Sequence, residues 1–152
     1  MKTIEYAHFG EVISDEFIPL LNRNRIREHL INHELFDAES IESWINGKIE
    51  LDACKGCKIR AILVDKQLAG WCGIQREDSK YEVAIVIDDS HWGLGIKIFR
   101  EVMVWAKILD HDTVFIHFLD TRPEYKFLRK IAKNVYGSEI LGSRFTTYEL
   151  AV

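Results

Sequence analysis

The pattern of apolar and polar positions divides the chain into a helical N-terminal third and a strand-rich remainder. Residues 3–9 alternate and predict a first strand, whereas 14–24, 25–32 and 37–47 carry apolar residues at helical spacing. Ser14 and Asp37 are suitable N-caps for the first and third helices, and Gly47 is a suitable end for the third. The N-terminal third therefore predicts one strand followed by helices.

After residue 57 the pattern becomes typical of a sheet. Residues 58–64 and 68–76 are apolar runs separated by the short turn Asp-Lys-Gln, so they predict a hairpin, and 81–88 adds a third antiparallel strand. The nearly continuous apolar run of this third strand indicates burial on both faces. The remaining pattern predicts a helix over 95–110, a buried strand over 113–120, a helix over 121–134 and an alternating last strand over 144–152. This order predicts an α+β fold with a mixed sheet, in which 81–88 and 113–120 run parallel.

Composition limits the classes of protein that fit this pattern. The chain has 152 residues, which suits a single domain over 1–152, and its 47% apolar and 29% charged residues are typical of a globular protein. The net charge of −4 does not favour a nucleic-acid partner. We find neither an apolar stretch long enough to span a membrane nor an N-terminal signal, so a cytoplasmic protein without a membrane partner is expected.

The cysteines form a C-x-x-C pattern that has to be weighed. Cys54 and Cys57 lie close together and Cys72 stands alone. A structural zinc site needs four ligands, and no second pair is present; a redox pair follows a strand, whereas this one precedes a strand. Reduced thiols in a turn are the favoured interpretation, a metal or redox role is the alternative, and no metal site is expected.

Two glycines flank one leucine between a buried strand and a long helix. The main-chain N–H groups in the first turn of a helix lack partners, so Gly93 and Gly95 would let a phosphate-like anion approach them closely. The Walker pattern is absent, and a dinucleotide fingerprint would require a small residue where Ile98 stands. The remaining interpretations are the pyrophosphate of an acyl-CoA and a turn that needs glycine for its shape alone.

The segment 81–107 resembles motif A of the GNAT superfamily of N-acetyltransferases, whose pattern is Q/R-x-x-G-x-G/A. The central Gly95 is kept, whereas Trp92 replaces the usual Gln or Arg and Lys97 replaces the final small residue. The order of elements over nearly the whole chain is similar too, and residues 24–45 more loosely resemble the ribosomal-protein N-terminal acetyltransferase branch. The resemblance implies the acyl-CoA N-acyltransferase fold: a central, mostly antiparallel sheet with helices on both faces.

The same resemblance implies where acetyl-CoA binds as a co-substrate. It would lie between strands 81–88 and 113–120, which splay apart, with backbone groups of Ile85 and Ile87 on the pantetheine arm and a nearby N–H on the thioester carbonyl. The amine attacks the thioester directly, so no Ser or Cys nucleophile is required. The residues whose main-chain amides would hold the pyrophosphate are Trp92, Gly93, Leu94, Gly95, Ile96 and Lys97.

Proton transfer needs a base for the amine, and Glu82 is the first candidate because the family often has an acid on this strand. A carboxylate facing solvent is the alternative for Glu82. His117 and His91 are further candidates for the base, and a chain of waters is another.

For the acid that protonates the thiolate, the family often has an N-x-x-A-x-x-L-Y pattern on the helix after 113–120. Its Asn and Tyr positions fall on Thr121 and Leu128, so Tyr125, one turn earlier, is the substitute candidate, with packing as its alternative role. The basic residues on this helix either are solvated or meet the 3′-phosphate of CoA; they are Lys126, Arg129, Lys130 and Lys133.

The function that the resemblance implies is transfer of acetyl from acetyl-CoA to a primary amine of a small molecule or peptide. The alternatives are a catalytically weak or inactive CoA-binding module and a protein-interaction module. Many proteins of this family dimerise, so a homodimer is compatible with the resemblance, but nothing in the sequence determines the oligomeric state.

Overall fold

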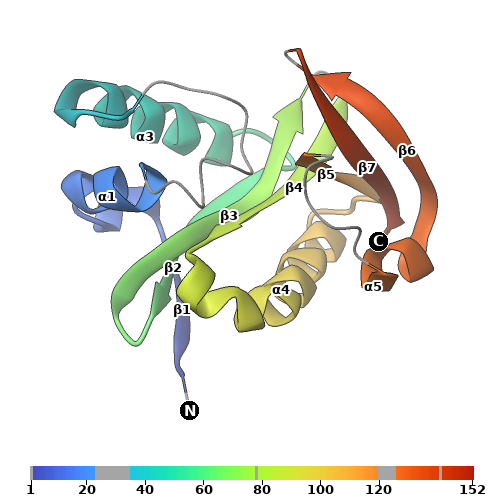
Figure 1. Ribbon diagram of the computed structural model, residues 1–152, viewed down its shortest axis with the longest axis horizontal. Helices are drawn as coiled ribbons and strands as arrows, with labels where there is room; N and C mark the ends of the chain where they lie inside the picture. The colour runs from blue at the N-terminus through green and yellow to red at the C-terminus, as the bar shows by residue number, and fades with distance from the viewer. Residues whose placement is uncertain (1, 23–34, 78, 120–125, 141) are drawn as a thin grey trace.

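The described residues form a seven-stranded sheet in the order β1-β2-β3-β4-β5-β7-β6 (Figure 1). The computed structural model describes residues 2–22, 35–77, 79–119, 126–140 and 142–152. All neighbouring strands are antiparallel except β4 and β5, as the sequence predicts. The strands are β1 (Ile4–Ala7), β2 (Lys58–Val64), β3 (Gln67–Glu77), β4 (Lys80–Ile87), β5 (Thr113–Leu119), β6 (Ala132–Ile140) and β7 (Ser143–Ala151), and the α-helices are α1 (Phe17–Leu21), α3 (Ala38–Asp52), α4 (Gly95–Ile108) and α5 (Lys126–Ile131).

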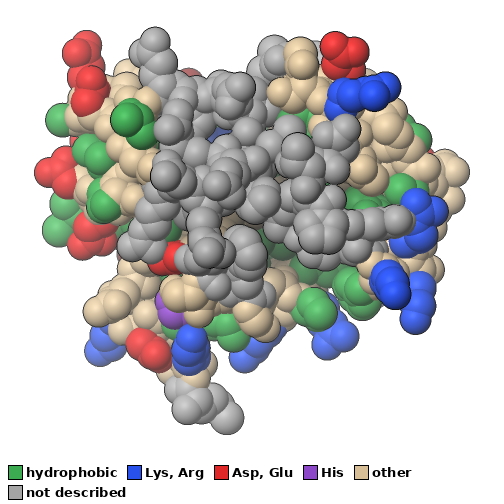
Figure 2. Space-filling model, in the orientation of Figure 1, with side chains coloured by type: hydrophobic (Ala, Val, Ile, Leu, Met, Phe, Trp, Pro, Cys, Tyr) green, Lys and Arg blue, Asp and Glu red, His purple; other side chains and the backbone are tan. Residues whose placement is uncertain are grey.

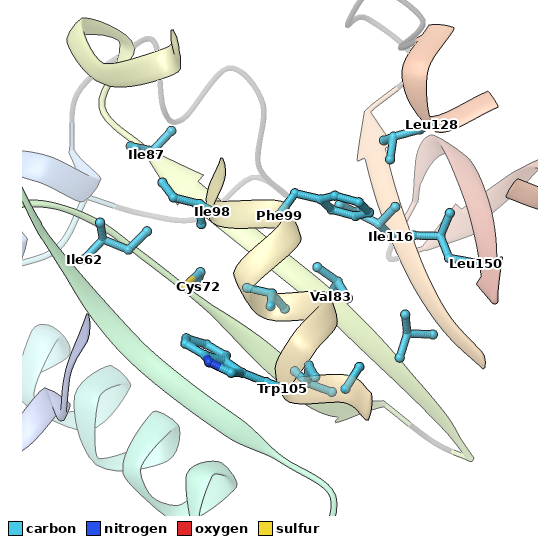
Figure 3. Close-up of a cluster of buried hydrophobic side chains, with 14 of the residues drawn as sticks. Ile62, Cys72, Val83, Ile87, Ile98, Phe99, Trp105, Ile116, Leu128 and Leu150 are labelled. Atoms are coloured by element: carbon cyan, nitrogen blue, oxygen red, sulfur yellow. The ribbon is translucent and has the colours of Figure 1, made fainter. Parts of the chain in front are cut away.

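Helices cover both faces of the sheet and bury two separate apolar cores. On one face, α4 inserts Ile98, Phe99 and Trp105 against side chains such as Cys72 and Val83 (Figure 3). On the other face, α1 and α3 pack a second cluster against β2, β3 and β4; its members include Phe17, Ile41, Ile45, Trp71 and Val86. The central strands are therefore buried on both sides, which explains their nearly continuous apolar runs.

Helix α3 begins where the sequence predicts but ends later. The carboxylate of Asp37 accepts hydrogen bonds from the N–H groups of Glu39 and Ser40, at 3.0 and 2.8 Å. The helix does not end at Gly47 but continues to Asp52. Leu51 packs against the second apolar cluster, and the Asp52 carboxylate accepts hydrogen bonds from the Ile59 N–H and the Arg60 guanidinium of β2. These contacts outweigh the roughly 1 kcal/mol that a glycine costs inside a helix. The predicted cap at Ser14 is wrong: this residue lies inside a 3₁₀ turn and α1 begins at Phe17. The helix predicted over 25–32 lies outside the described residues.

The C-terminal part of the chain contains a strand that the pattern did not indicate. The helix predicted over 121–134 ends at Ile131. The next residues form β6, whose one partner among the described strands is β7. The β6 segment contains Lys, Asn, Gly, Ser and Glu, which disfavour strands, so the pairing with β7 determines its conformation. In the described parts of the chain, no helix has the length and apolar character required to cross a membrane.

Candidate functional site

The two parallel strands in the middle of the sheet separate soon after they meet. Among the described residues, β4 and β5 share one registered pair, Glu82 with Phe115. The antiparallel partners on the outer sides are paired along the whole of each strand: β3 with β4, and β7 with β5. The ladder between β4 and β5 therefore ends toward the C-terminal ends of the two strands, at the centre of the sheet.

The orientation of the β4 backbone follows from its contacts with β3. A Cβ added at Gly70 would lie 1.9 Å from the Val86 carbonyl oxygen, and the Asp88 N–H donates to the Ala69 carbonyl at 2.8 Å. Val86 and Asp88 thus direct their main-chain groups toward β3. Because these groups alternate sides along a strand, those of Ile85 and Ile87 face β5, where registered pairing has ended.

The glycine turn is a 3₁₀ helix that leads straight into α4. The 3₁₀ turn covers Asp89–Leu94 and α4 begins at Gly95, as predicted. The N-cap of α4 is Leu94, which offers no side-chain hydrogen bond to the first turn, whereas Asp37 caps α3. Gly93, Ile96 and Lys97 are exposed around this helix end. Of Trp92 only the backbone is described, and it belongs to the 3₁₀ turn.

Neither glycine of the turn is required by the fold. A Cβ added at Gly93 or Gly95 would meet no atom within 4 Å, and neither residue has the positive φ that favours glycine. Gly70 is the opposite case, because its added Cβ would collide with the Val86 carbonyl. The interpretation of the turn as a loop that needs glycine for shape alone is therefore wrong at these two positions.

Glu82 is half-buried and lies in a polar cluster on the face of the sheet that α3 covers. Gln75, its registered neighbour on β3, hydrogen-bonds to the Glu82 carboxylate, and Glu77 shares a hydrogen bond with it. Burial raises the pKa of Glu82 to about 8, and the neighbouring Glu77 adds to the rise. The ammonium of Lys48 and the Gln75 hydrogen bond oppose it. A carboxyl group with this pKa can exchange a proton near neutral pH.

His117 joins the same cluster from β5. One ligand atom each of Glu77, Glu82 and His117 lies within 4.8 Å of the others. The Nδ1 atom of His117 lies 2.7 Å from the Thr147 hydroxyl, which in turn lies 2.6 Å from the Ser138 hydroxyl. Burial lowers the pKa of His117, so the imidazole is neutral at pH 7.

Lys48 was not predicted from the sequence to belong to this site. It contributes a positive charge to the cluster around Glu82. Its Nζ donates to the Gln75 side-chain oxygen at 2.7 Å and lies 4.3 Å from the ring centroid of Trp71 and 5.6 Å from that of Trp44. Burial lowers the pKa of Lys48 to about 8, and the Glu82 carboxylate opposes this shift. The sequence carries no signal for this contact, because 34 positions separate Lys48 from Glu82.

The spacing of Glu77, Glu82 and His117 would by itself suit a divalent cation. Lys48 already places a positive charge beside Glu82, and Glu82 favours its protonated form, so both features oppose a second cation. We therefore do not identify this cluster as a metal site.

The other sequence candidates lie apart from this cluster or outside the described residues. His91 is in the 3₁₀ turn, with its Nδ1 3.2 Å from the Lys2 Nζ. Leu128, at the position where the family has its Tyr, is 5% exposed and belongs to the apolar core. Tyr125 and Thr121 lie outside the described residues, so Tyr125 stays a prediction.

Charge is distributed unequally over the surface. Figure 2 shows Asp and Glu side chains gathered over α1 and α3, on the left, while Lys and Arg lie mainly over α4, α5 and β6. Exposed residues on α3 include Glu39, Glu42 and Glu50, whereas α5 contributes exposed Lys126, Arg129 and Lys130. The acidic side adjoins the Glu82 cluster, and the basic side adjoins α4.

Comparison with known proteins supports the fold at low sequence identity. No family model and no curated protein matches the chain. Solved structures do match: a GNAT-family acetyltransferase from Streptococcus pneumoniae has a TM-score of 0.68 at 15% identity, and the alignment covers 100% of both chains. The ribosomal-protein α-N-acetyltransferase RimL has a TM-score of 0.73 at 16% identity over 99% of this chain and 91% of its own. A variant of the spermidine N-acetyltransferase SpeG from Vibrio cholerae has a TM-score of 0.67 at 14% identity over 99% and 93%. A mixed sheet in this order, with helices on both faces, is thus the fold of the GNAT acetyltransferases, and this chain has that fold.

Proposed function

We propose that the chain is an acetyl-CoA-dependent N-acetyltransferase that transfers acetyl directly to a primary amine of a small molecule or peptide. The observation that carries the proposal is the pair of glycines at the start of α4, which no contact or backbone angle of the fold requires. Removing two side chains there leaves main-chain N–H groups accessible to an anion, at a helix end without a side-chain cap.

Three features of the structure support acetyl-CoA as the acyl donor. The turn at residues 92–97 would hold the pyrophosphate, and the main-chain groups of Ile85 and Ile87 face the gap in strand pairing, where the pantetheine arm would bind. The basic surface of α5 would attract the 3′-phosphate. Acetyl-CoA would supply the activated acyl group.

On the opposite face, Glu82 is the proposed general base for the acceptor amine. Its raised pKa lets it accept a proton near neutral pH. The hydrogen bond with Gln75 orients the carboxylate, and His117 lies next to it. The acidic surface around α3 would favour a cationic acceptor. Structural similarity to SpeG and RimL, named for spermidine and for a ribosomal protein, is consistent with either a small polyamine or a peptide N-terminus as acceptor.

A CoA-binding module without catalysis is the second candidate, and one observation favours it. The position where the family has its Tyr is Leu128, which is buried in the apolar core, so no acid acts from there. Transfer would then depend on water, or on Tyr125, for protonation of the departing thiolate.

Two measurements separate these proposals. Calorimetry with acetyl-CoA tests the binding site; no heat and no thermal shift at high ligand concentration would contradict both candidates. Release of free thiol is then measured over polyamines, amino acids and N-terminal peptides. Release with any of these amines supports the enzyme, whereas binding without release supports the module.

A further inference from the structure

Lys48 lies on the acceptor side of the proposed site with its amino group over the central strands. Its Nζ contacts Trp71 and Gln75, which lie two residues before and two residues after Gly73 on β3. Gly73 is registered with Ala84 on β4, and Gln75 with Glu82. The amino group therefore lies above the section of β3 and β4 that is lined by the small residues Gly73 and Ala84.

This section of β4 borders the gap between β4 and β5. Ala84 precedes Ile85, whose main-chain groups face that gap, and one strand spacing of about 4.8 Å separates neighbouring strands. The Lys48 side chain has four flexible methylene groups, and its Nζ donates to the uncharged amide oxygen of Gln75, so a short displacement releases it.

The surroundings of Lys48 favour a neutral amine beside a proton acceptor. Burial lowers its pKa to about 8, which raises the neutral fraction at pH 7.4 to about a fifth, roughly two-hundred-fold above that of an ordinary lysine. The charged and titratable groups that face it are Glu82 on β4, Glu77 on β3 and His117 on β5, and the rings of Trp44 and Trp71 complete its contacts.

We propose that Lys48 is itself an acceptor, and that with acetyl-CoA bound the domain acetylates the Nζ of its own Lys48. The proposal rests on the proposed function, because acetyl-CoA is the acyl donor. It adds a modification site in the chain itself, built from α3, β3 and β4, which neither the motif nor the fold implies.

The reaction balances with these groups alone. The lone pair of the neutral Nζ forms a bond to the acyl carbon, the carbon–sulfur bond breaks, and its electron pair leaves on the CoA sulfur. The Nζ loses one proton to the Glu82 carboxylate, and the thiolate takes one proton from water. The products are an amide on Lys48 and free CoA thiol.

Acetylation would alter the site that carries it out. The amide has no charge, so the cation–π contacts with Trp71 and Trp44 are lost. Lys48 no longer lowers the pKa of Glu82, which then rises further. The modified protein should therefore require a higher pH to deprotonate Glu82 and to turn over external amines.

The experiment incubates the full chain with acetyl-CoA alone and maps acetylated lysines by peptide mass spectrometry over time. Lys48 should be modified at least ten-fold faster than any other lysine, with a rate constant independent of protein concentration. Gly95→Glu, designed to block the cofactor turn, should abolish the modification, and Glu82→Gln should slow it. Lys58→Arg is the matched control, since Lys58 also lies over a tryptophan ring, Trp105, but on the face covered by α4.

A readout without the cofactor uses trace labelling by acetic anhydride at a series of pH values. Labelling of Lys48 should rise with a midpoint near pH 8, and Glu82→Gln should shift that midpoint to lower pH, because a negative charge that holds the ammonium is removed. A midpoint near that of ordinary lysines would overturn the assigned environment of Lys48.

The outcomes distinguish this proposal from the proposed function. If acetyl-CoA binds and external amines are acetylated while Lys48 stays unmodified, the self-acetylation proposal is wrong and the enzyme proposal stands. If acetyl-CoA does not bind, both are wrong. Modification that persists in Gly95→Glu, or that grows with protein concentration, would show a chemical or intermolecular reaction and would also overturn it.

Discussion

Replacement of Gly95 by alanine should stabilise the protein and weaken acetyl-CoA binding at the same time. Gly95 is the first residue of α4, its φ is not positive, and an added Cβ meets no atom within 4 Å. Under these conditions a Gly→Ala change lowers the entropy of the unfolded chain and gains about 0.4–1 kcal/mol in free energy of unfolding. For a domain of this size, that corresponds to a rise in Tm of about 1–4 °C.

The same methyl group would occupy the space that the proposal gives to the pyrophosphate. Displacing one hydrogen bond between a main-chain N–H and a charged oxygen costs about 1.5–3 kcal/mol. Because about 1.4 kcal/mol corresponds to a ten-fold change in Kd, the expected loss of affinity is about 10- to 100-fold. The measurements are thermal unfolding of the free protein and calorimetric titration with acetyl-CoA.

Gly47→Ala is the matched control. Gly47 lies inside α3, and its added Cβ also meets no atom within 4 Å, so a similar gain in stability is expected. It is remote in sequence from the turn and should leave the Kd for acetyl-CoA unchanged. The reasoning would be refuted if Gly95→Ala lowered Tm, which would mean that the fold requires the glycine. An unchanged Kd would equally refute it, because nothing would then approach this backbone.

Three further changes test the proton chemistry and the cores. Glu82→Gln should lower kcat/KM by about 10²- to 10⁴-fold and remove the rise of the rate with pH through about 8, as measured in a thiol-release pH profile; a variant that keeps this rise would exclude Glu82 as the base. The raised pKa of Glu82 means that the folded protein retains a proton that the unfolded chain loses near pH 4.3. The contribution of this group to the free energy of unfolding therefore falls as the pH rises from about 4.3 to 8. Denaturant titrations at about pH 5 and 8 should show that Glu82→Gln abolishes this fall, and the same pH dependence in the variant would contradict the desolvated environment of Glu82. Ile98→Ala, at a side chain that is 0% exposed under α4, should cost about 2–5 kcal/mol in free energy of unfolding by urea denaturation, and a loss below about 1 kcal/mol would contradict the described core. Tyr125→Phe should reduce kcat without weakening acetyl-CoA binding if its hydroxyl is the acid; equal kcat values would leave water as the proton donor.

The helices and strands could be predicted from the sequence wherever local signals and tertiary contacts agree. The meander of β2, β3 and β4, the parallel placement of β5 and the start of α4 at Gly95 are confirmed. The exceptions have physical reasons: α3 continues through Gly47 because Leu51 packs against the second apolar cluster and Asp52 bonds to Ile59 and Arg60 of β2, and β6 forms because β7 supplies its hydrogen-bond partners. Neither reason is visible in a short window of sequence.

The candidate site also has one part that could be recognised from the sequence and another that could not. The glycine turn and Glu82 are each recognisable from a single continuous segment, because the helix start, the glycines and the acid on the preceding strand lie within about fifteen positions. The partners of Glu82 come from α3, β3 and β5, and strand register decides which of the many polar residues on those segments meet it.

By itself, the sequence determined the order of the helices and strands other than β6, the burial of the central strands and the place of the glycine turn, because these follow from periodicity and local backbone chemistry. Only the tertiary structure decided that the fold does not require Gly93 and Gly95 to be glycine, since that depends on which atoms surround an added Cβ. It also decided that Glu82 is half-buried, where the charge of Lys48 acts on it. A pKa depends on desolvation and on charges brought together across the sheet, and those distances exist only once the chain has folded.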